Sequence, residues 1–143
     1  MKEINFTIYG KPKAKGRPRV MKSGYTFTPK ATVEYENLVK LSYLQSVGKV
    51  DPFDGPLIVE IDFFFEIPKS YSKKRKTNIL TKRELYTKKP DIDNLIKSIT
   101  DGLNEVAFND DKQIVTVIAR KHYTTEAQRA EVLIKEVGAN ILE

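Results

Sequence analysis

Residues 57–66 read LIVEIDFFFE, and this stretch decides the fold. Every second residue in it is apolar, and these residues share one side: Leu57, Val59, Ile61, Phe63 and Phe65. The opposite side carries the acidic residues Glu60, Asp62 and Glu66. This alternation is typical of a β-strand with one face in the core and the other toward water. The stretch therefore predicts one strand of a sheet, and Pro68 ends it.

Further strands are expected on both sides of this one. Near the start of the chain, Ile4, Phe6 and Ile8 alternate with polar residues or tyrosine, which again has the period of a strand. Strands over about 113–123 and 131–137 close the chain. Residues 25–27 are expected to form a short strand or one arm of a hairpin.

Two main helices are expected between the strands. The first begins at Thr28 and Pro29, with a hydroxyl as N-cap and proline at the first helical position, and runs to about Val47. Its apolar stripe is expected to consist of Val33, Leu38, Leu41 and Leu44. The second helix spans about 93–104, with a core side formed by Leu95, Ile99 and Leu103.

The order of these elements predicts an α+β fold, with a mixed sheet of about four strands and two main helices packed on it. Strands and helices do not alternate strictly, so a doubly wound sheet is not expected. The 143 residues are expected to form one domain over 1–143. Within it, residues 69–89 are polar and basic, and we expect a short helix at 72–80 and a mobile remainder.

Composition excludes several classes of function. The chain has no cysteine, which excludes disulfides, thiolate catalysis and iron–sulfur clusters, and its single histidine, His122, argues against histidine-rich metal sites. No apolar run approaches the ~18 residues of a membrane span. The first residues lack the apolar core of a signal peptide. We therefore expect a cytoplasmic protein with neither a membrane partner nor a small-molecule cofactor.

Charge is segregated along the chain, whose net charge is +6. Residues 1–40 carry nine basic and three acidic side chains, and residues 67–89 carry nine and one. The segments 41–66 and 90–143 are both acidic. Basic blocks of this kind favour a polyanionic partner such as nucleic acid. A solvated surface with an uneven distribution of charged loops would give the same charge counts.

The most informative motif begins at residues 89–97, which read KPDIDNLIK. Pro90 favours extended geometry around it, so Asp91 and Asp93 are expected to project to the same side. Asp93, Lys97 and Asp101 then follow at helical spacing, on the face opposite the predicted core side.

A second acidic motif, NDDKQ, occupies residues 109–113 and precedes a predicted strand. If that strand lies beside the start of the helix, Asp110 and Asp111 converge with Asp91 and Asp93. Clustered carboxylate oxygens suit a hard divalent cation such as Mg²⁺ or Mn²⁺, which activates water for phosphodiester hydrolysis. Lys97 would assist by stabilising negative charge in the transition state.

Each of these residues also has a purely structural interpretation. Asp93 would be an N-cap, Asp110 and Asp111 would form a turn, and Lys97 would pair with a carboxylate one helical turn away. The combination of all of them around one helix and one strand favours the functional interpretation.

These motifs resemble the RusA family of Holliday junction resolvases, metal-dependent endonucleases of bacteria and their prophages. The resemblance rests on KPDIDNLIK at 89–97, DGLN at 101–104 and DDKQI at 110–114, together with the loop at 10–20 and its RPR at 17–19. Many relatives have glycine after the Leu-Asn pair, where this chain has Glu105. The turn must then find its positive-φ residue elsewhere, for which Asn104 is the candidate.

The resemblance implies roles for individual residues. It places the catalytic carboxylates at Asp91, Asp93 and Asp111 and the essential lysine at Lys97. Asp110 matches a further acidic position and joins the three aspartates as a predicted metal ligand. The resemblance also implies Mg²⁺ dependence, a homodimer and symmetric nicking of four-way DNA junctions.

Two basic segments are expected to contact DNA, because an acidic site alone repels phosphate. The first basic segment comprises residues 11–19, and the second comprises residues 69–89. Tyr71 and Tyr86 lie within the second segment and are candidates for stacking on splayed bases. The predicted DNA-binding residues are Lys11, Lys13, Lys15, Arg17, Arg19, Lys73, Lys74, Arg75, Lys76, Lys88 and Lys89.

The sequence thus predicts a dimeric, Mg²⁺-dependent endodeoxyribonuclease that resolves four-way junctions in DNA recombination and repair. Two other hypotheses stay open: a non-catalytic DNA-binding or architectural protein, and a metal-dependent nuclease that acts on flaps, forks or RNA.

Overall fold

A four-stranded mixed sheet lies at the centre of the computed structural model, which describes residues 2–138. Its strands are β1 (Glu3–Tyr9), β4 (Leu57–Glu66), β5 (Ile114–Thr124) and β6 (Arg129–Glu136), in the spatial order β1-β6-β4-β5. β6 runs antiparallel to both β1 and β4, whereas β4 and β5 are parallel. The sheet is therefore mixed, as predicted, and β5 is one of its two edges.

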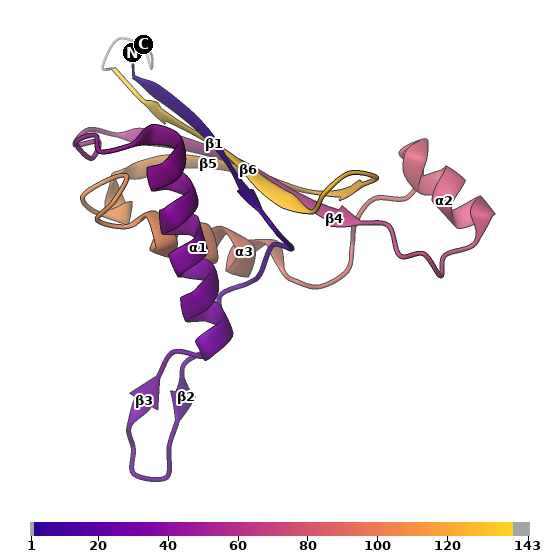
Figure 1. Ribbon diagram of the computed structural model, residues 1–143, viewed down its shortest axis with the longest axis horizontal. Helices are drawn as coiled ribbons and strands as arrows, with labels where there is room; N and C mark the ends of the chain where they lie inside the picture. The colour runs from indigo at the N-terminus through magenta and orange to yellow at the C-terminus, as the bar shows by residue number, and fades with distance from the viewer. Residues whose placement is uncertain (1, 139–143) are drawn as a thin grey trace.

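Two helices, α1 (Lys30–Val47) and α3 (Ile92–Leu103), cover one face of this sheet (Figure 1). The apolar side of β4 faces them and is completely buried, as the alternation predicted. From α3, the predicted residues Leu95, Ile99 and Leu103 are also fully buried. The predicted α+β fold is confirmed, and α3 is fixed to the core along its whole length.

The orientation of α1 differs from the prediction. Its buried face consists of Thr32, Tyr35, Val39 and Tyr43. The predicted apolar stripe lies at the surface, with exposed fractions of 36–52% for Val33, Leu38, Leu41 and Leu44. The reason is aromatic packing: the ring of Tyr43 meets that of Phe6 edge-on at 5.3 Å, and tyrosine buries more area than leucine. The prediction was wrong here, and it leaves an apolar surface on α1.

The start of α1 also lies one residue later than predicted. The helix begins at Lys30, and Pro29 occupies the cap position with φ −54° and ψ 143° and without a side-chain cap. Thr28 is therefore not the N-cap. The carbonyl of Pro29 instead accepts from the amides of Thr32 and Val33, which closes the first turn.

The smaller elements are a hairpin and two short helices. The hairpin of β2 (Arg19–Val20) and β3 (Thr26–Phe27) and the helix α2 (Lys73–Leu80) project from the body in different directions (Figure 1). A 3-10 helix, η1 (Asp111–Gln113), precedes β5. Within residues 2–138, no helix combines the length and apolar character needed to cross a membrane.

Part of the basic segment that was expected to be mobile packs against the sheet. The ring of Tyr86 stacks on that of Phe65 at 4.4 Å, and the Tyr86 hydroxyl donates to the carbonyl of Lys89. The Lys121 ammonium donates to the carbonyl of Lys88. These contacts connect residues 86–89 to β4 and β5. They also leave Tyr86 stacked on protein rather than open to bases.

Gly102 permits the close approach of α3 to α1. A Cβ at this position would lie 2.8 Å from Val39 Cβ and 3.1 Å from the backbone oxygen of Glu36. We expect Gly102→Ala to lower the free energy of unfolding by about 1–3 kcal/mol, as overpacking of a core does. Thermal or urea unfolding measures this loss. Gly138→Ala is the matched control, because nothing lies within 4 Å of its added methyl group, and equal stability of the two variants would contradict the packing argument.

The turn after α3 takes its positive-φ residue from Glu105 itself. Glu105 has φ +69°, whereas Asn104, the predicted residue, has φ −59°. A left-handed conformation costs a residue other than glycine about 1–2 kcal/mol. Glycine also has more conformational entropy in the unfolded chain, which offsets part of the gain from removing this strain. We therefore expect Glu105→Gly to stabilise the protein by roughly 0.5–1 kcal/mol. Asn104→Gly should destabilise it, so urea unfolding of both variants tests the sign.

Candidate active site

The start of α3 presents two of the predicted catalytic carboxylates. Asp91 occupies the cap position with φ −68° and ψ 142°, and Asp93 lies in the first helical turn. Both residues are exposed. The interpretation of Asp93 as the N-cap is therefore wrong, and the Asp91 side chain makes no capping hydrogen bond. Two carboxylates thus lie two positions apart at the start of α3 and are accessible to a ligand.

An open hollow of about 420 Å³ borders Asp91. It is lined by Lys11 and Ala14 from the first basic segment, by Lys89 and Pro90 from the second, and by Asn94 of α3. The two basic segments, far apart in the sequence, thus meet beside a carboxylate. A phosphate group that enters this hollow would meet a lysine from each of the two segments.

Lys121 of β5 fixes the chain just before Asp91. Its ammonium donates to the carbonyl of Lys88 at 2.8 Å and to that of Pro90 at 3.0 Å. Charge-assisted hydrogen bonds of this kind are stronger than neutral ones. The backbone position from which Asp91 projects is thereby set by the sheet.

A three-residue ion-pair cluster anchors the first basic segment to α3. The Lys15 ammonium lies 2.7 Å from Glu36 Oε2 and 3.1 Å from Asp101 Oδ2. Partial burial by itself lowers the pKa of Lys15, but its hydrogen bonds and ion pairs with the two carboxylates raise the pKa above its usual value overall. The Lys15 amide also donates to the carbonyl of Asn94. Lys15, predicted to bind DNA, therefore serves as an anchor for the loop, and Asp101 acquires a structural role.

Lys97 pairs with Asp101 rather than with Asp93. Its ammonium lies 3.4 Å from Asp101 Oδ1, and its side chain is 57% exposed. The ion-pair interpretation of Lys97 is thus confirmed as far as Asp101 is concerned. Because the lysine is exposed on the same helix as Asp93, one turn further along, it is also open to a ligand there.

The second acidic motif forms a capped turn. The Lys112 amide donates to Asp110 Oδ1 at 2.9 Å, and this hydrogen bond is the main cause that lowers the pKa of Asp110. Gln113 accepts from the Asp110 amide and donates to the carbonyls of Phe53 and Gly55. The turn interpretation is therefore correct for Asp110, while Asp111 begins η1 with its side chain exposed.

A single chain does not bring the two acidic motifs together. Lys121, near the end of β5, contacts Pro90 at the start of α3, so α3 runs back toward the start of β5. Asp111 directly precedes that start. At about 3.3 Å per residue, the part of β5 from Ile114 to Lys121 separates Asp111 from Asp91 by about 20 Å. The condition for convergence is thus not met within one chain, because the strand begins beside the end of the helix and not beside its start.

The carboxylates at the start of α3 indicate which kind of metal ion the site would bind. The carboxylate oxygens of Asp91 and Asp93 are ligands that Mg²⁺ prefers. Within residues 2–138, however, no three acidic or histidine side chains are gathered closely enough to hold a metal ion. One chain therefore offers two of the four predicted ligands, Asp91 and Asp93, at the start of α3.

The other predicted DNA-binding residues differ in their surroundings. Lys11, Lys13, Arg17 and Arg19 are exposed along the first basic segment, and Lys73, Lys74 and Lys89 are exposed in the second. Arg75 is engaged: it pairs with Glu84 at 3.0 Å and stacks on Tyr71 at 3.7 Å. Lys76 donates to the carbonyl of Lys69, and Lys88 donates to the Tyr71 hydroxyl. On α2, Lys73 and Lys74 are thus free of such contacts and exposed, whereas Arg75 and Lys76 make contacts within the second basic segment.

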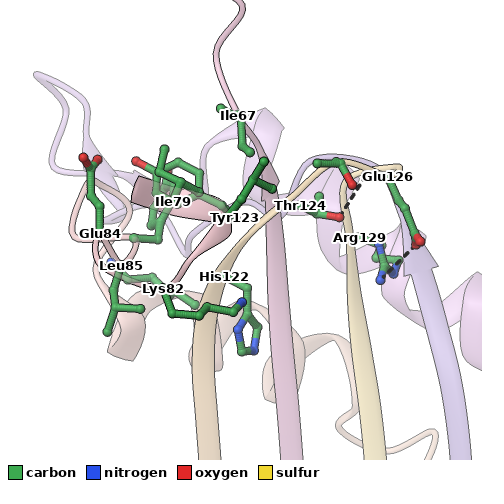
Figure 2. Close-up of a pocket in the computed structure, with 14 residues that line it drawn as sticks. Ile67, Ile79, Lys82, Glu84, Leu85, His122, Tyr123, Thr124, Glu126 and Arg129 are labelled. Carbon is green, nitrogen blue, oxygen red and sulfur yellow. Dashed lines mark hydrogen bonds and ion pairs between the residues drawn. The ribbon is translucent and has the colours of Figure 1, made fainter. Parts of the chain in front are cut away.

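A second hollow, of about 280 Å³, lies between the segment after α2 and the turn where β5 ends and β6 begins (Figure 2). Its lining mixes Lys82 and Arg129 with Glu84 and Glu126, and Arg129 pairs with Glu126. It contains none of the predicted carboxylates. The hollow beside Asp91 is therefore the better candidate for the active site, although this one is more enclosed.

Lys121 is the site residue that sequence reasoning missed. Side chains of a strand point alternately to its two sides. Lys121 is on the same side of β5 as Val115, Val117 and Ala119, the side that faces α3. A lysine on the inward side of a strand needs an oxygen partner. That signal was present in the sequence, but the partner carbonyls lie about 30 residues away and only the fold reveals them.

The fold and the site define a class of protein. An α+β chain with exposed basic segments on both sides of a carboxylate has the features expected of a nucleic-acid-binding protein. Residues 9–135 match the family model described as Endodeoxyribonuclease RusA, and the chain belongs to this RusA family of nucleases. It is also 34% identical over 141 residues to "Uncharacterized protein YqaN" of Bacillus subtilis (strain 168), covering 95% of this chain and 98% of that relative. The resemblance noted from the motifs is confirmed.

Proposed function

We propose that this chain is a Mg²⁺-dependent endonuclease that cuts four-way DNA junctions by paired, symmetric nicks, in the recombination and repair of bacterial or prophage DNA in the cytoplasm. The observation that carries the proposal is the exposed Asp91, in a hollow lined by Lys11 and Lys89, in a member of a family of endodeoxyribonucleases. The carboxylate supplies the chemistry, and the lysines make the hollow accessible to a phosphodiester.

The proposed roles follow from the position of each group. Asp91 and Asp93 would hold the metal, which when bound activates water and polarises the phosphodiester. Lys11 and Lys89, on the walls of the hollow, would hold the phosphate in place. Lys97 would stabilise negative charge that develops during cleavage, because it is exposed one helical turn after Asp93.

A homodimer is part of the proposal. Asp111 lies about 20 Å from Asp91 in one chain, so a set of three carboxylates requires a second chain. With two-fold symmetry, Asp91 and Asp93 of each chain would be joined by Asp111, and by Asp110 beside it, from the other. Two such sites match the two symmetric nicks that a four-way junction needs.

The exposed cations would supply the affinity for DNA. Arg17 and Arg19 flank Pro18 at the base of the projecting hairpin, whose strand β2 begins at Arg19, and their forked guanidinium groups suit phosphate oxygens. Lys73 and Lys74 are exposed on α2, at the other projection from the body. Phosphate contacts of this kind hold the nucleic acid without reading its sequence.

Cleavage assays with three labelled substrates test this function. We expect the protein to nick a four-way junction with Mg²⁺, or with Mn²⁺ as substitute, and to bind it without cutting when the metal is chelated. Duplex and flap DNA should be cut poorly. Asp91→Asn should abolish cutting while binding in chelator stays equal or becomes tighter, because one negative charge near the phosphate is removed.

Two results would replace the proposal. Binding without cleavage of any substrate would make the protein a DNA-binding or architectural one. Equal cutting of junction, duplex and flap, or a preference for RNA, would keep the nuclease chemistry and remove the junction selectivity.

A further inference from the structure

A small hollow of about 130 Å³ lies next to the one beside Asp91. Lys11 lines both hollows. Tyr86 and Tyr123 form part of the wall of the smaller one, and we call it the tyrosine hollow. A ligand held through a phosphate at Lys11 can therefore place one part beside Asp91 and another part in the tyrosine hollow.

The walls of the tyrosine hollow are mainly apolar and packed on one another. Phe65 is buried in the core, and its ring stacks on that of Tyr86 at 4.4 Å. The ring of Tyr123 meets that of Tyr86 at 4.9 Å and an angle of 64°, and Pro68 adds a further apolar surface. Because these contacts are made within the chain, the hollow exists before a ligand arrives. Hollows with apolar walls and a few polar groups suit flat organic rings.

Gln128 is the polar group that can recognise such a ring. It is half-buried and lines the tyrosine hollow. Its Oε1 accepts from the amide of Glu66 at 3.2 Å, and its backbone carbonyl accepts from the amide of Gly10 at 3.0 Å. These two hydrogen bonds orient the side-chain amide. Its Nε2 makes no hydrogen bond within residues 2–138, so this donor is available to a ligand.

The charges around the tyrosine hollow favour a ligand that carries phosphate. Lys11 and Lys88 both line it, and Glu66 is the one acidic residue in its lining. The larger hollow of Figure 2 also includes Tyr86 and Tyr123, but it does not include Lys11 and so does not adjoin the hollow beside Asp91. A flat ring joined to a phosphate is the chemistry of a nucleotide.

We propose that the tyrosine hollow binds one unstacked nucleobase of the DNA strand whose phosphate lies beside Asp91, and that Gln128 Nε2 donates a hydrogen bond to that base. This inference rests on the proposed function, because it takes DNA as the ligand. It also supplies a reason for junction selectivity. A base must leave its stack to enter the hollow, and this costs least where pairing is already disrupted, as at an open branch point.

The free donor of Gln128 predicts which bases fit best. Its Oε1 is occupied by the Glu66 amide, so the side chain offers the ligand only N–H groups. Guanine and thymine have a carbonyl oxygen where adenine and cytosine have an amino group. At one nucleotide of the strand, we therefore expect guanine or thymine to be preferred over adenine or cytosine by about tenfold in affinity.

Four-way junctions with one abasic position test the hollow without any cleavage. The abasic position is moved one nucleotide at a time through the branch point, and the affinity of the full-length protein is measured in chelator at fixed salt. We expect a single position at which removal of the base lowers the affinity by about tenfold. All four bases are then compared at that position. Equal affinity for every abasic junction would overturn the proposal.

Two substitutions of Gln128 test its role. Gln128→Glu keeps an acceptor for the Glu66 amide but has no N–H to donate, so the preference at this position should reverse toward adenine or cytosine. Gln128→Leu removes donor and acceptor and should reduce the preference to less than about twofold. Gln45→Glu is the matched control, because Gln45 is exposed on α1 and the change of charge is the same. It should keep the wild-type preference.

The outcomes separate the base site from the proposed function. A base preference that stays the same in both Gln128 variants would overturn the proposal even if junctions are cut. An abasic effect at one position, with a preference that reverses in Gln128→Glu, would keep the base site even in a protein that cuts no DNA, and only the nuclease function would then be lost.

Discussion

A mixture of the Asp91→Asn and Asp111→Asn variants is expected to regain nicking activity that each variant lacks alone. Each variant by itself should lose essentially all cutting, because a carboxylate ligand becomes a neutral amide at both sites of its dimer. In a mixed dimer both substitutions fall into the same site if Asp111 acts across the dimer. The other site then holds Asp91, Asp93 and Asp111 unchanged.

The expected recovery has a definite size. After equal mixing and free exchange, half of the dimers are mixed and each has one intact site, so about a quarter of the wild-type number of sites returns. The products should be single nicks rather than paired ones. A labelled four-way junction, read on denaturing and native gels, measures both quantities.

The matched control combines Asp91→Asn with Asp93→Asn. These residues lie two positions apart at the start of the same α3, so every site of the mixed dimer keeps a substitution and no activity should return. Failure of the first mixture, once mixed dimers have been isolated with two affinity tags, would show that each site is built from one chain. Such a result would require Asp111 to have no part in the site.

The alternation of apolar residues predicted the sheet because burial of one face leaves a direct trace in the sequence. β4 shows this alternation along its whole length, and the five apolar residues on its core-facing side are all buried. α3 has it as well, since Leu95, Ile99 and Leu103 leave no other choice of core face. Where one face is much more apolar than the other, local sequence decides the structure.

α1 shows where that reasoning fails. Its sequence offers two apolar faces, one rich in leucine and one containing Tyr35, Val39 and Tyr43, and the helix buries the second. The choice depends on partners from elsewhere in the chain: Phe6 packs against Tyr43, and Gly102 leaves room for Val39. A local pattern contains no information about these partners.

The candidate site was predictable in its residues but not in its arrangement. The spacing of Asp91, Asp93 and Lys97 indicated exposed groups on one helix, and all three are exposed. Whether Asp111 lies near them depends on the direction of α3 relative to β5, which follows from the parallel pairing of β4 and β5. A crossover helix between parallel strands runs opposite to both, so its start and the start of the next strand lie at opposite ends of the sheet.

Lys121→Met is expected to reduce cleavage by about a hundredfold while DNA binding in chelator stays unchanged. The ammonium of Lys121 holds the carbonyls of Lys88 and Pro90, at 2.8 and 3.0 Å, and methionine cannot donate to either. The backbone before Asp91 then loses its tie to β5. A displacement of a catalytic group by about 1 Å is enough to cost this much rate.

The dependence on metal distinguishes positioning from general loss of stability. Because Asp91 would be displaced rather than removed, the Mg²⁺ concentration for half-maximal cutting should rise, and saturating Mg²⁺ should recover part of the rate. Lys121→Arg, which keeps the charge and the donors, should retain more activity than Lys121→Met. Lys49→Met is the matched control, since Lys49 is exposed just after α1 and lies in neither acidic motif. An unchanged Mg²⁺ requirement in Lys121→Met, with the same loss of rate, would show that the lysine stabilises the fold without positioning Asp91.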